Sequence, residues 1–316
     1  MTDWREQDDL PPLLQKLLKV MERAKDYEVS PRKKPKRSVL PFHIQHNTTP
    51  VVVKTIVTKL DAAIEETPFS PGTWSKIKPF LHQLDILTTN GTLTPLGERL
   101  RRLVAQEPEL LGEAMHGHLY TLYRFNSAVR FSFAYATICD WLWERRQGIV
   151  TGRVMAELVS IVVERGSAVY GIPPEEIAFS PNSVRGAFHW LKSLHPPVLE
   201  RNPASKAWLF HRRRQCPPLA VLWALSTWWQ LNNVPVGEWV TWHEALEDFL
   251  SRCLMLDDGY AKIAVEVTAG WQRWRGKVLE VQMQGQFLTA LRLNRLVSWG
   301  SSWIEGNLES GSPELP

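Results

Sequence analysis

The chain has 316 residues, of which 44% are hydrophobic and 22% charged, and its formal net charge is +4. This composition excludes a largely disordered chain, and the length predicts two or three domains. No stretch reaches the roughly 18 apolar residues of a membrane span, and the polar, acidic start does not resemble a signal peptide. The cysteines Cys139, Cys216 and Cys253 form no CxxC or zinc pattern, so we expect a reduced, cytoplasmic protein without a membrane span.

Residues 1–38 predict one helix followed by a basic linker. Leucines recur at helical spacing from Leu10 to Leu18. Between Pro31 and Arg37, five of seven residues are basic, and the prolines in this run disfavour a helix. The run is either a solvated linker or an arm that follows nucleic-acid phosphates.

Residues 39–106 predict a winged helix-turn-helix module. Thr49-Pro50 is typical of the start of a helix, which continues to Ile64. A second helix is predicted from Thr73 to about Leu87, although Pro79 should kink it or move its start downstream.

The sequence after this second helix predicts the wing. Asn90-Gly91 lies between two short runs rich in Leu and Thr, which is a strong hairpin signal because both turn residues must adopt positive φ. A third helix is predicted over residues 96–104. The order helix, helix, hairpin, helix indicates a winged module, a fold that serves both nucleic-acid and protein binding.

The rest of the chain predicts further helices and a possible second winged module. A helix over 180–194 precedes two short β-type runs and an apolar helix. The predicted segments are a helical core (107–178), the possible second winged helix (179–232), a Trp-rich C-terminal domain (233–300) and a flexible tail (301–316). The fold class is therefore expected to be mainly α, with winged helix-turn-helix modules whose small β-wings pack on a helical core.

Candidate nucleic-acid contacts lie on the first winged module. Its second helix carries cations beside neutral hydrogen-bonding side chains, and an arginine cluster follows the wing. A helix of this kind fits the major groove, and its side chains reach phosphates or base edges. The alternative is a solvated helical face. The candidates are Lys76, Lys78, Thr73, Ser75, Arg99, Arg101 and Arg102.

A second candidate region covers residues 182–215, which hold seven Lys or Arg residues and one Glu, so their net charge is seven minus one, or +6. Within it, Arg212, Arg213 and Arg214 follow an aromatic run, an arrangement suited to backbone contact and base stacking. The alternative is a basic loop that binds nothing.

The chain also contains fifteen Trp residues, most of them from Trp208 onwards. They are either buried anchors, a stacking platform, or the core of a surface that binds a protein partner.

Enzyme and metal patterns are not found. His43 and His46 form an HxxH, and His116 and His118 an HxH, but neither has a flanking Glu or a third ligand at a recognisable spacing, so no metal or other cofactor is expected. No P-loop, GxGxxG, GxSxG or kinase motif occurs, so the chain is not expected to be an enzyme. A nuclease with carboxylates scattered along the chain stays open.

Several phrases resemble a known family by their layout. These are Leu40-Pro41-Phe42-His43, the helix after Pro50, Thr94-Pro95-Leu96-Gly97-Glu98 and the helix of 180–194. Together they are similar to an uncharacterised winged-helix-containing domain family found beside phosphorothioate DNA-modification and phage-defence genes. Where the family tends to show a His-Glu-Thr-Phe phrase, this chain reads Phe42-His43-Ile44-Gln45-His46-Asn47-Thr48-Thr49. The resemblance implies a bacterial, DNA-linked accessory protein and assigns no catalytic residues.

The function expected from the sequence is DNA binding, as a transcriptional regulator or as an accessory subunit of a DNA-modification or antiviral defence system. The alternative is a non-catalytic subunit that binds a protein partner through the Trp-rich C-terminal region.

Overall fold

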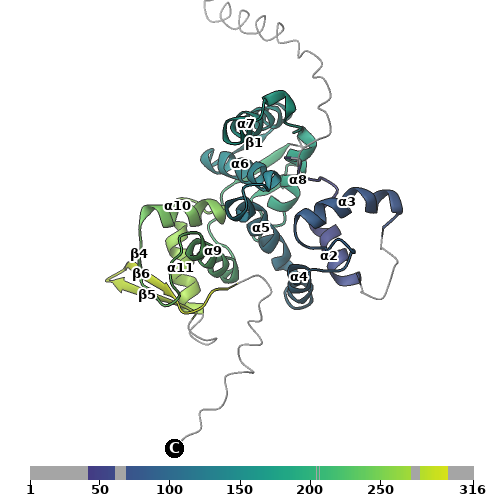
Figure 1. Cartoon of the computed structure of the whole chain (residues 1–316). Helices are drawn as coiled ribbons and strands as arrows, with labels where there is room; N and C mark the ends of the chain where they lie inside the picture. Colours follow the sequence, from purple (N-terminus) through teal and green to yellow (C-terminus); the bar gives the residue numbers. More distant parts are fainter. Residues whose placement is uncertain (1–41, 61–68, 204, 206, 272–277, 298–316) are drawn as a thin grey trace, which may run out of the picture. The chain divides into compact units, whose positions relative to one another are not determined.

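The computed structural model describes residues 42–60, 69–203, 205, 207–271 and 278–297. The predicted N-terminal helix, the basic linker and the C-terminal tail lie outside these residues. The described chain is mostly helical with two small antiparallel sheets, as the sequence predicts (Figure 1). No helix in the described part is long and apolar enough to cross a membrane.

The first three described helices are α2 (Pro50–Lys59), α3 (Pro71–Gln83) and α4 (Pro95–Gln106). Each begins with a Ser or Thr cap followed by proline, whose missing N–H costs nothing in a first turn. Pro79 lies inside α3 without ending it. Both Pro79 and Ser75, whose carbonyl loses its intrahelical donor, are exposed, so water can satisfy that carbonyl.

The predicted wing of this module is reduced to a turn. Leu87 and Leu93 form one isolated bridge, and the Thr88 N–H donates to the Thr92 carbonyl at 2.8 Å. Gly91 has a φ of 86°, whereas Asn90 is not in the left-handed region, so the turn is not the one predicted from two positive φ angles. No named strand forms there in the described chain.

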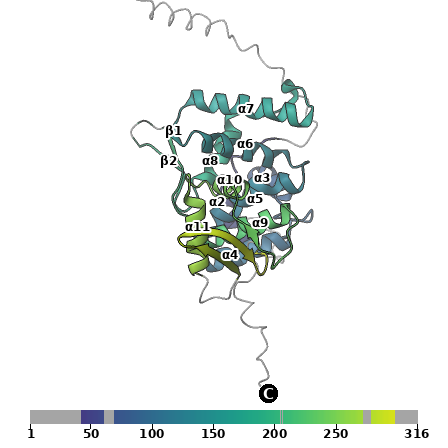
Figure 2. The ribbon, with the colours of Figure 1, turned by 90° about the vertical axis from the view of Figure 1, so that its left-hand side faces the viewer.

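The middle of the chain contains α5 (Leu111–Phe125) and α6 (Arg130–Glu144), followed by β1 (Gln147–Val150), α7 (Gly152–Tyr170) and α8 (Pro181–Leu191). The short helices η2 (Pro108–Leu110) and η3 (Pro174–Glu176) precede α5 and α8. In Figure 2, α7 extends above α6 and α8, and it contacts both helices.

The hairpin predicted after α8 is confirmed as β2 (Leu199–Arg201) and β3 (Trp208–His211). β1 is a third strand that the sequence did not predict, and it pairs antiparallel with β3, with Gly148 opposite Phe210, to give the order β1-β3-β2. Only Val150 of its four residues is buried, so β1 shows no alternating pattern, and its partner is distant in sequence.

The C-terminal region begins with α9 (Pro218–Leu231), which is buried along almost its whole length. Then come β4 (Val240–Thr241), α10 (Glu244–Cys253), α11 (Tyr260–Trp271), β5 (Leu279–Gln284) and β6 (Phe287–Leu293). The second sheet has the order β4-β6-β5. Trp223, Trp228 and Trp229 of α9 are buried, which confirms that several of the C-terminal tryptophans are core anchors.

A buried ion pair joins α5 to the segment between β3 and α9. Arg213 is 1% exposed, and its Nη1 and Nη2 donate to the two carboxylate oxygens of Glu113 at 2.6 and 2.9 Å. Arg213 Nε also donates to the Leu254 carbonyl at 2.7 Å, and Glu113 accepts from the His195 N–H at 2.8 Å. Burial alone would raise the pKa of Glu113, but the charge and hydrogen bonds of Arg213 lower it overall.

His116 lies one turn further along α5 and is also buried. Its Nδ1 is 2.8 Å from the Tyr135 hydroxyl, and its Nε2 is 2.8 Å from the Cys253 carbonyl. The neutral ring satisfies both groups when Nε2–H donates to the carbonyl and Nδ1 accepts from the hydroxyl. Burial lowers the pKa of His116 to about 4, with the charge of Arg213 acting in the same direction.

We expect Glu113→Gln to destabilise the protein by about 3–5 kcal/mol, because it leaves the Arg213 guanidinium buried without its counter-charge. Urea unfolding followed by circular dichroism measures this change. The control is Glu157→Gln, which breaks a half-exposed pair with Arg145 and should cost at most about 1 kcal/mol. Equal effects of the two variants would contradict the central role of the buried pair.

We also expect the free energy of unfolding to depend on pH through His116. Its folded pKa of about 4 lies below the ordinary value of 6.5, so its stabilisation is complete above pH 6.5 and is lost as the pH falls toward 4. The loss attributable to this one group is on the order of 3 kcal/mol. Unfolding titrations from neutral to acidic pH should show a shallower slope for His116→Gln than for the wild type, and parallel slopes would refute the assignment.

Candidate nucleic-acid interface

The structure corrects the prediction that Arg212, Arg213 and Arg214 form a binding run. Arg213 is enclosed with Glu113, and Arg212 is only 8% exposed, so neither guanidinium reaches a nucleic acid in this structure. Arg214 is exposed and lies over the ring of Tyr260 at 5.7 Å. Arg212 and Arg213 are buried because the segment after β3 passes between the middle helices and α10. There their guanidinium groups donate to backbone carbonyls and pair with carboxylates.

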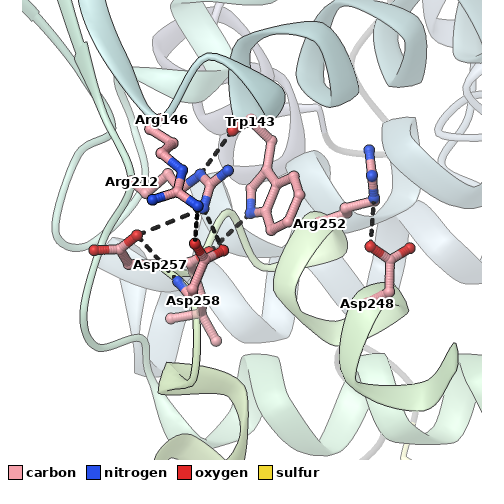
Figure 3. A network of polar contacts seen from close by, with 8 residues as sticks. Trp143, Arg146, Arg212, Asp248, Arg252, Asp257 and Asp258 are labelled. Carbon is pink, nitrogen blue, oxygen red and sulfur yellow. Dashed lines mark hydrogen bonds and ion pairs between the residues drawn. The ribbon is translucent and has the colours of Figure 1, made fainter. Parts of the chain in front are cut away.

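Arg212 belongs to a polar network on Trp143 (Figure 3). Its guanidinium stacks on the indole at 3.8 Å, its Nε donates to the Trp143 carbonyl, and its Nη1 donates to Asp258 at 2.5 Å. Arg146 contacts the other oxygen of Asp258 at 2.9 Å, and Arg252 lies over the same indole at 4.5 Å. The network joins α6, β3, α10 and the turn before α11, so its role is structural.

The three arginines after the wing have different positions. Arg101 Nε donates to the Val57 carbonyl at 2.8 Å, and its Nη2 donates to the Leu60 carbonyl. This residue therefore closes the C-terminal end of α2, where carbonyls lack helical partners. Arg99 is half-buried with its Nε enclosed, and Arg102 is exposed. The three arginines therefore do not form the exposed cluster expected from the sequence, because only Arg102 is exposed.

The predicted residues of α3 are better placed for binding. Thr73, Ser75 and Lys76 are exposed, and Lys78 is half-buried. The Lys78 ammonium lies beside the turn of residues 87–93, because a Cβ added at Gly91 would be 3.6 Å from Lys78 Nζ. Two lysines therefore lie on the same helix, one of them next to the turn of residues 87–93.

A polar stripe on α8 lies within the basic region of residues 182–215, of which the sequence analysis singled out only the arginine run. Asn182, Arg185, His189 and Lys192 follow one another at i, i+3, i+7 and i+10, which places them on one face of the helix at its end. All four are exposed or half-buried, whereas the opposite face is enclosed in the core. Arg185 Nη1 donates to Asn182 Oδ1 at 2.8 Å, which holds the two side chains side by side. The spacing itself was a signal that could have identified this face.

The segment of residues 42–48 contacts both helices. Gly186 of α8 packs directly on it, since a Cβ added there would lie 2.7 Å from the Ile44 carbonyl and 3.3 Å from His46 Cα. His43 Nδ1 is 2.5 Å from Ser183 Oγ of α8, and Gln45 Nε2 donates to the Lys76 carbonyl of α3 at 3.1 Å. We call the surface made by residues 42–48, α3 and the α8 stripe the α3–α8 face.

The segments that form the α3–α8 face carry no acidic residue. No Asp or Glu occurs in residues 42–60, 69–84 or 177–199, whereas α3 contributes two lysines and α8 an arginine and a lysine. Clefts and faces of one charge sign concentrate ligands of the opposite sign. The chemistry of the face, cations interleaved with amide, hydroxyl and imidazole groups, is suited to phosphates and base edges.

The histidine patterns do not form a metal centre in the part of the chain that the structure describes, where no group of three or more His, Cys, Asp or Glu side chains is placed to hold an ion. His116 and His118 point to different partners, since His118 Nε2 is 3.0 Å from the Leu84 carbonyl whereas His116 bonds Tyr135 and Cys253. Comparisons with family models, curated proteins and solved structures find no match to this chain.

Gly186→Ala should separate residues 42–48 from α8, because its methyl group would press on the Ile44 backbone rather than on a flexible side chain. We expect faster amide hydrogen exchange over these residues, measured by mass spectrometry. Gly148→Ala is the matched control, since nothing lies within 4 Å of a Cβ added there. Unchanged protection in Gly186→Ala would show that this packing does not hold the segment.

Proposed function

We propose that the protein binds double-stranded nucleic acid, most directly DNA, with α8 as the recognition helix of a winged helix-turn-helix unit spanning residues 130–211. The supporting observation is the polar α8 stripe, which lies on the second of the two successive helices α7 and α8 and has no carboxylate on its element. This unit begins earlier than the second winged module expected from the sequence, because α6, β1 and α7 belong to it.

The order of elements supports a winged unit. From α6 the chain runs helix, strand, two helices and a two-stranded hairpin, with the first strand pairing to the last. In helix-turn-helix proteins the second of the two successive helices enters the major groove, which is wide enough to admit a helix. In the present chain that helix is α8, and the hairpin of β2 and β3 takes the place of the wing.

The first module contributes to the same surface in this proposal. Gln45 touches α3 while its neighbours Ile44 and His46 touch α8, so the two helices border one short segment. Lys76 and Lys78 then add phosphate contacts beside the recognition helix, as the sequence analysis expected of them. Phosphate contacts fix the register of a protein on a duplex, whereas base-edge contacts determine sequence preference. Asn182 and Arg185 are suited to the second role, since Asn pairs with adenine and Arg with guanine.

The cellular role that we propose is the one suggested by the family resemblance, a regulator or an accessory subunit of a DNA-modification or defence system. Sequence-independent phosphate binding alone would suit an accessory subunit, whereas a regulator requires discrimination between sequences. For a regulator, replacing Asn182 or Arg185 should change the preference for one duplex sequence over another. For an accessory subunit, it should weaken binding to all duplexes alike.

A second candidate function is binding of a protein partner by the C-terminal region. Ile263, Val267 and Trp271 of α11 are exposed at i, i+4 and i+8, and Met283 and Phe287 are exposed on the hairpin of β5 and β6. Exposed apolar side chains gathered in one region are typical of interaction surfaces. The two functions use different parts of the chain, so they are compatible.

Arg185→Ala should weaken binding to a labelled random duplex because the recognition helix loses a cation, and, as a base-edge contact, it should leave the slope of log K against log salt nearly unchanged. Lys76→Ala combined with Lys78→Ala should weaken binding and lower that slope by about two, because two phosphate contacts are lost. Fluorescence anisotropy at several salt concentrations measures both effects. Arg165→Ala removes an exposed cation from the C-terminal half of α7 and is the matched control.

The outcomes separate the candidate functions. Salt-dependent binding that the α8 variant weakens and the α7 variant does not would support the proposal. Binding equally reduced by all variants would indicate attraction by net charge alone. No binding at low salt would overturn the proposal and leave the C-terminal surface as the functional part of the chain.

A further inference from the structure

Besides His82 of α3, the α3–α8 face contains three histidines to which the proposed duplex contacts assign no role. His43 and His46 lie in the 42–48 segment with their ring centroids 6.5 Å apart, and His189 belongs to the α8 stripe. The gathering depends on the tertiary structure, because the first two histidines are more than 140 positions from the third.

His189 is the member of this cluster with access to a ligand. It is half-buried, and its stripe neighbours Arg185 and Lys192 are exposed, so its ring borders the surface that the stripe forms. His43 already forms a hydrogen bond with Ser183 Oγ, and the Nδ1 atom of His46 is enclosed without a hydrogen-bond partner.

The charges around His189 favour an anion. Arg185 lies on the same helix and Lys192 at its C-cap, His46 acts on the ring from the 42–48 segment, and none of these groups is acidic. Burial, Lys192 and His46 all lower the pKa of His189. In the free protein at neutral pH the ring is therefore mostly uncharged.

We propose that His189 contacts a backbone phosphate of the bound nucleic acid and takes up a proton when it does so. This inference rests on the proposed duplex binding. It assigns a phosphate ligand to one residue of that surface and predicts a pH dependence of binding. A phosphate next to the ring supplies the counter-charge that the free protein lacks, and a protonated ring is a charge-assisted donor to a phosphate oxygen. Proton uptake and phosphate binding then strengthen each other.

The sign of the pH effect follows from this linkage. Because the bound state holds one more proton than the free state, affinity should rise as the pH falls from about 8 to about 6, by at most about tenfold per pH unit for a single proton. Phosphodiesters do not titrate in this range, so the protein is the source of the effect. Lysine and arginine contacts alone give affinities that are nearly independent of pH here.

The test is duplex affinity of the whole chain by fluorescence anisotropy at about pH 8, 7 and 6 and constant ionic strength, for the wild type and His189→Gln. We expect the variant to bind like the wild type at the highest pH and to lose the gain at the lowest. His243→Gln, at the start of α10 and outside the proposed winged unit, is the matched control and should keep the gain. Thermal unfolding of each variant shows whether it is folded.

Three results decide between the possibilities. Loss of the pH dependence in His189→Gln alone supports the inference. A pH dependence that persists in His189→Gln, or that is absent from the wild type, overturns it while duplex binding stands. No duplex binding at any pH overturns the proposed function itself and the inference with it.

Discussion

The buried pair of Arg213 and Glu113 is the contact on which the arrangement of the helices depends. Its five polar side-chain atoms all have hydrogen-bond partners. The guanidinium donates to both carboxylate oxygens and to the Leu254 carbonyl, and the carboxylate also accepts from the His195 N–H. Such matching is what makes a buried ion pair tolerable, because unpaired charges in the core are strongly unfavourable. The pair joins α5, the end of α10 and the segments on both sides of the β2–β3 hairpin.

The same segment shows how cationic residues are used for folding rather than for binding. Arg212 is next to Arg213 in the chain but belongs to a different network. It stacks on Trp143 and pairs with Asp258 (Figure 3). Planar guanidinium groups suit both environments, since they stack on aromatic rings and donate in several directions. These arginines therefore hold the β3–α9 connection against α6 and α10, and they thereby fix the hairpin beside α8.

The candidate interface follows from this framework. With one face of α8 in the core and a second side covered by residues 42–48, the remaining face is the stripe of Asn182, Arg185, His189 and Lys192. Binding groups on a helix held in this way need little reordering when a ligand arrives, which favours affinity. The stripe, the lysines of α3 and the histidines between them lie on segments that contain no Asp or Glu.

The sequence by itself determined the helices and the local signals, because caps, prolines and apolar spacing act over a few residues. It predicted α2, α8, α9 and the β2–β3 hairpin, and it placed Lys76 on an exposed helix. Only the tertiary structure decided that β1 pairs with β3, that Asn90-Gly91 forms a turn with one bridge, and that Arg212 and Arg213 are interior. A run of arginines looks the same in a sequence whether its counter-charges are phosphates or a glutamate 100 positions away, as Glu113 is from Arg213. Partners of that kind are set by packing, which the order of residues does not show.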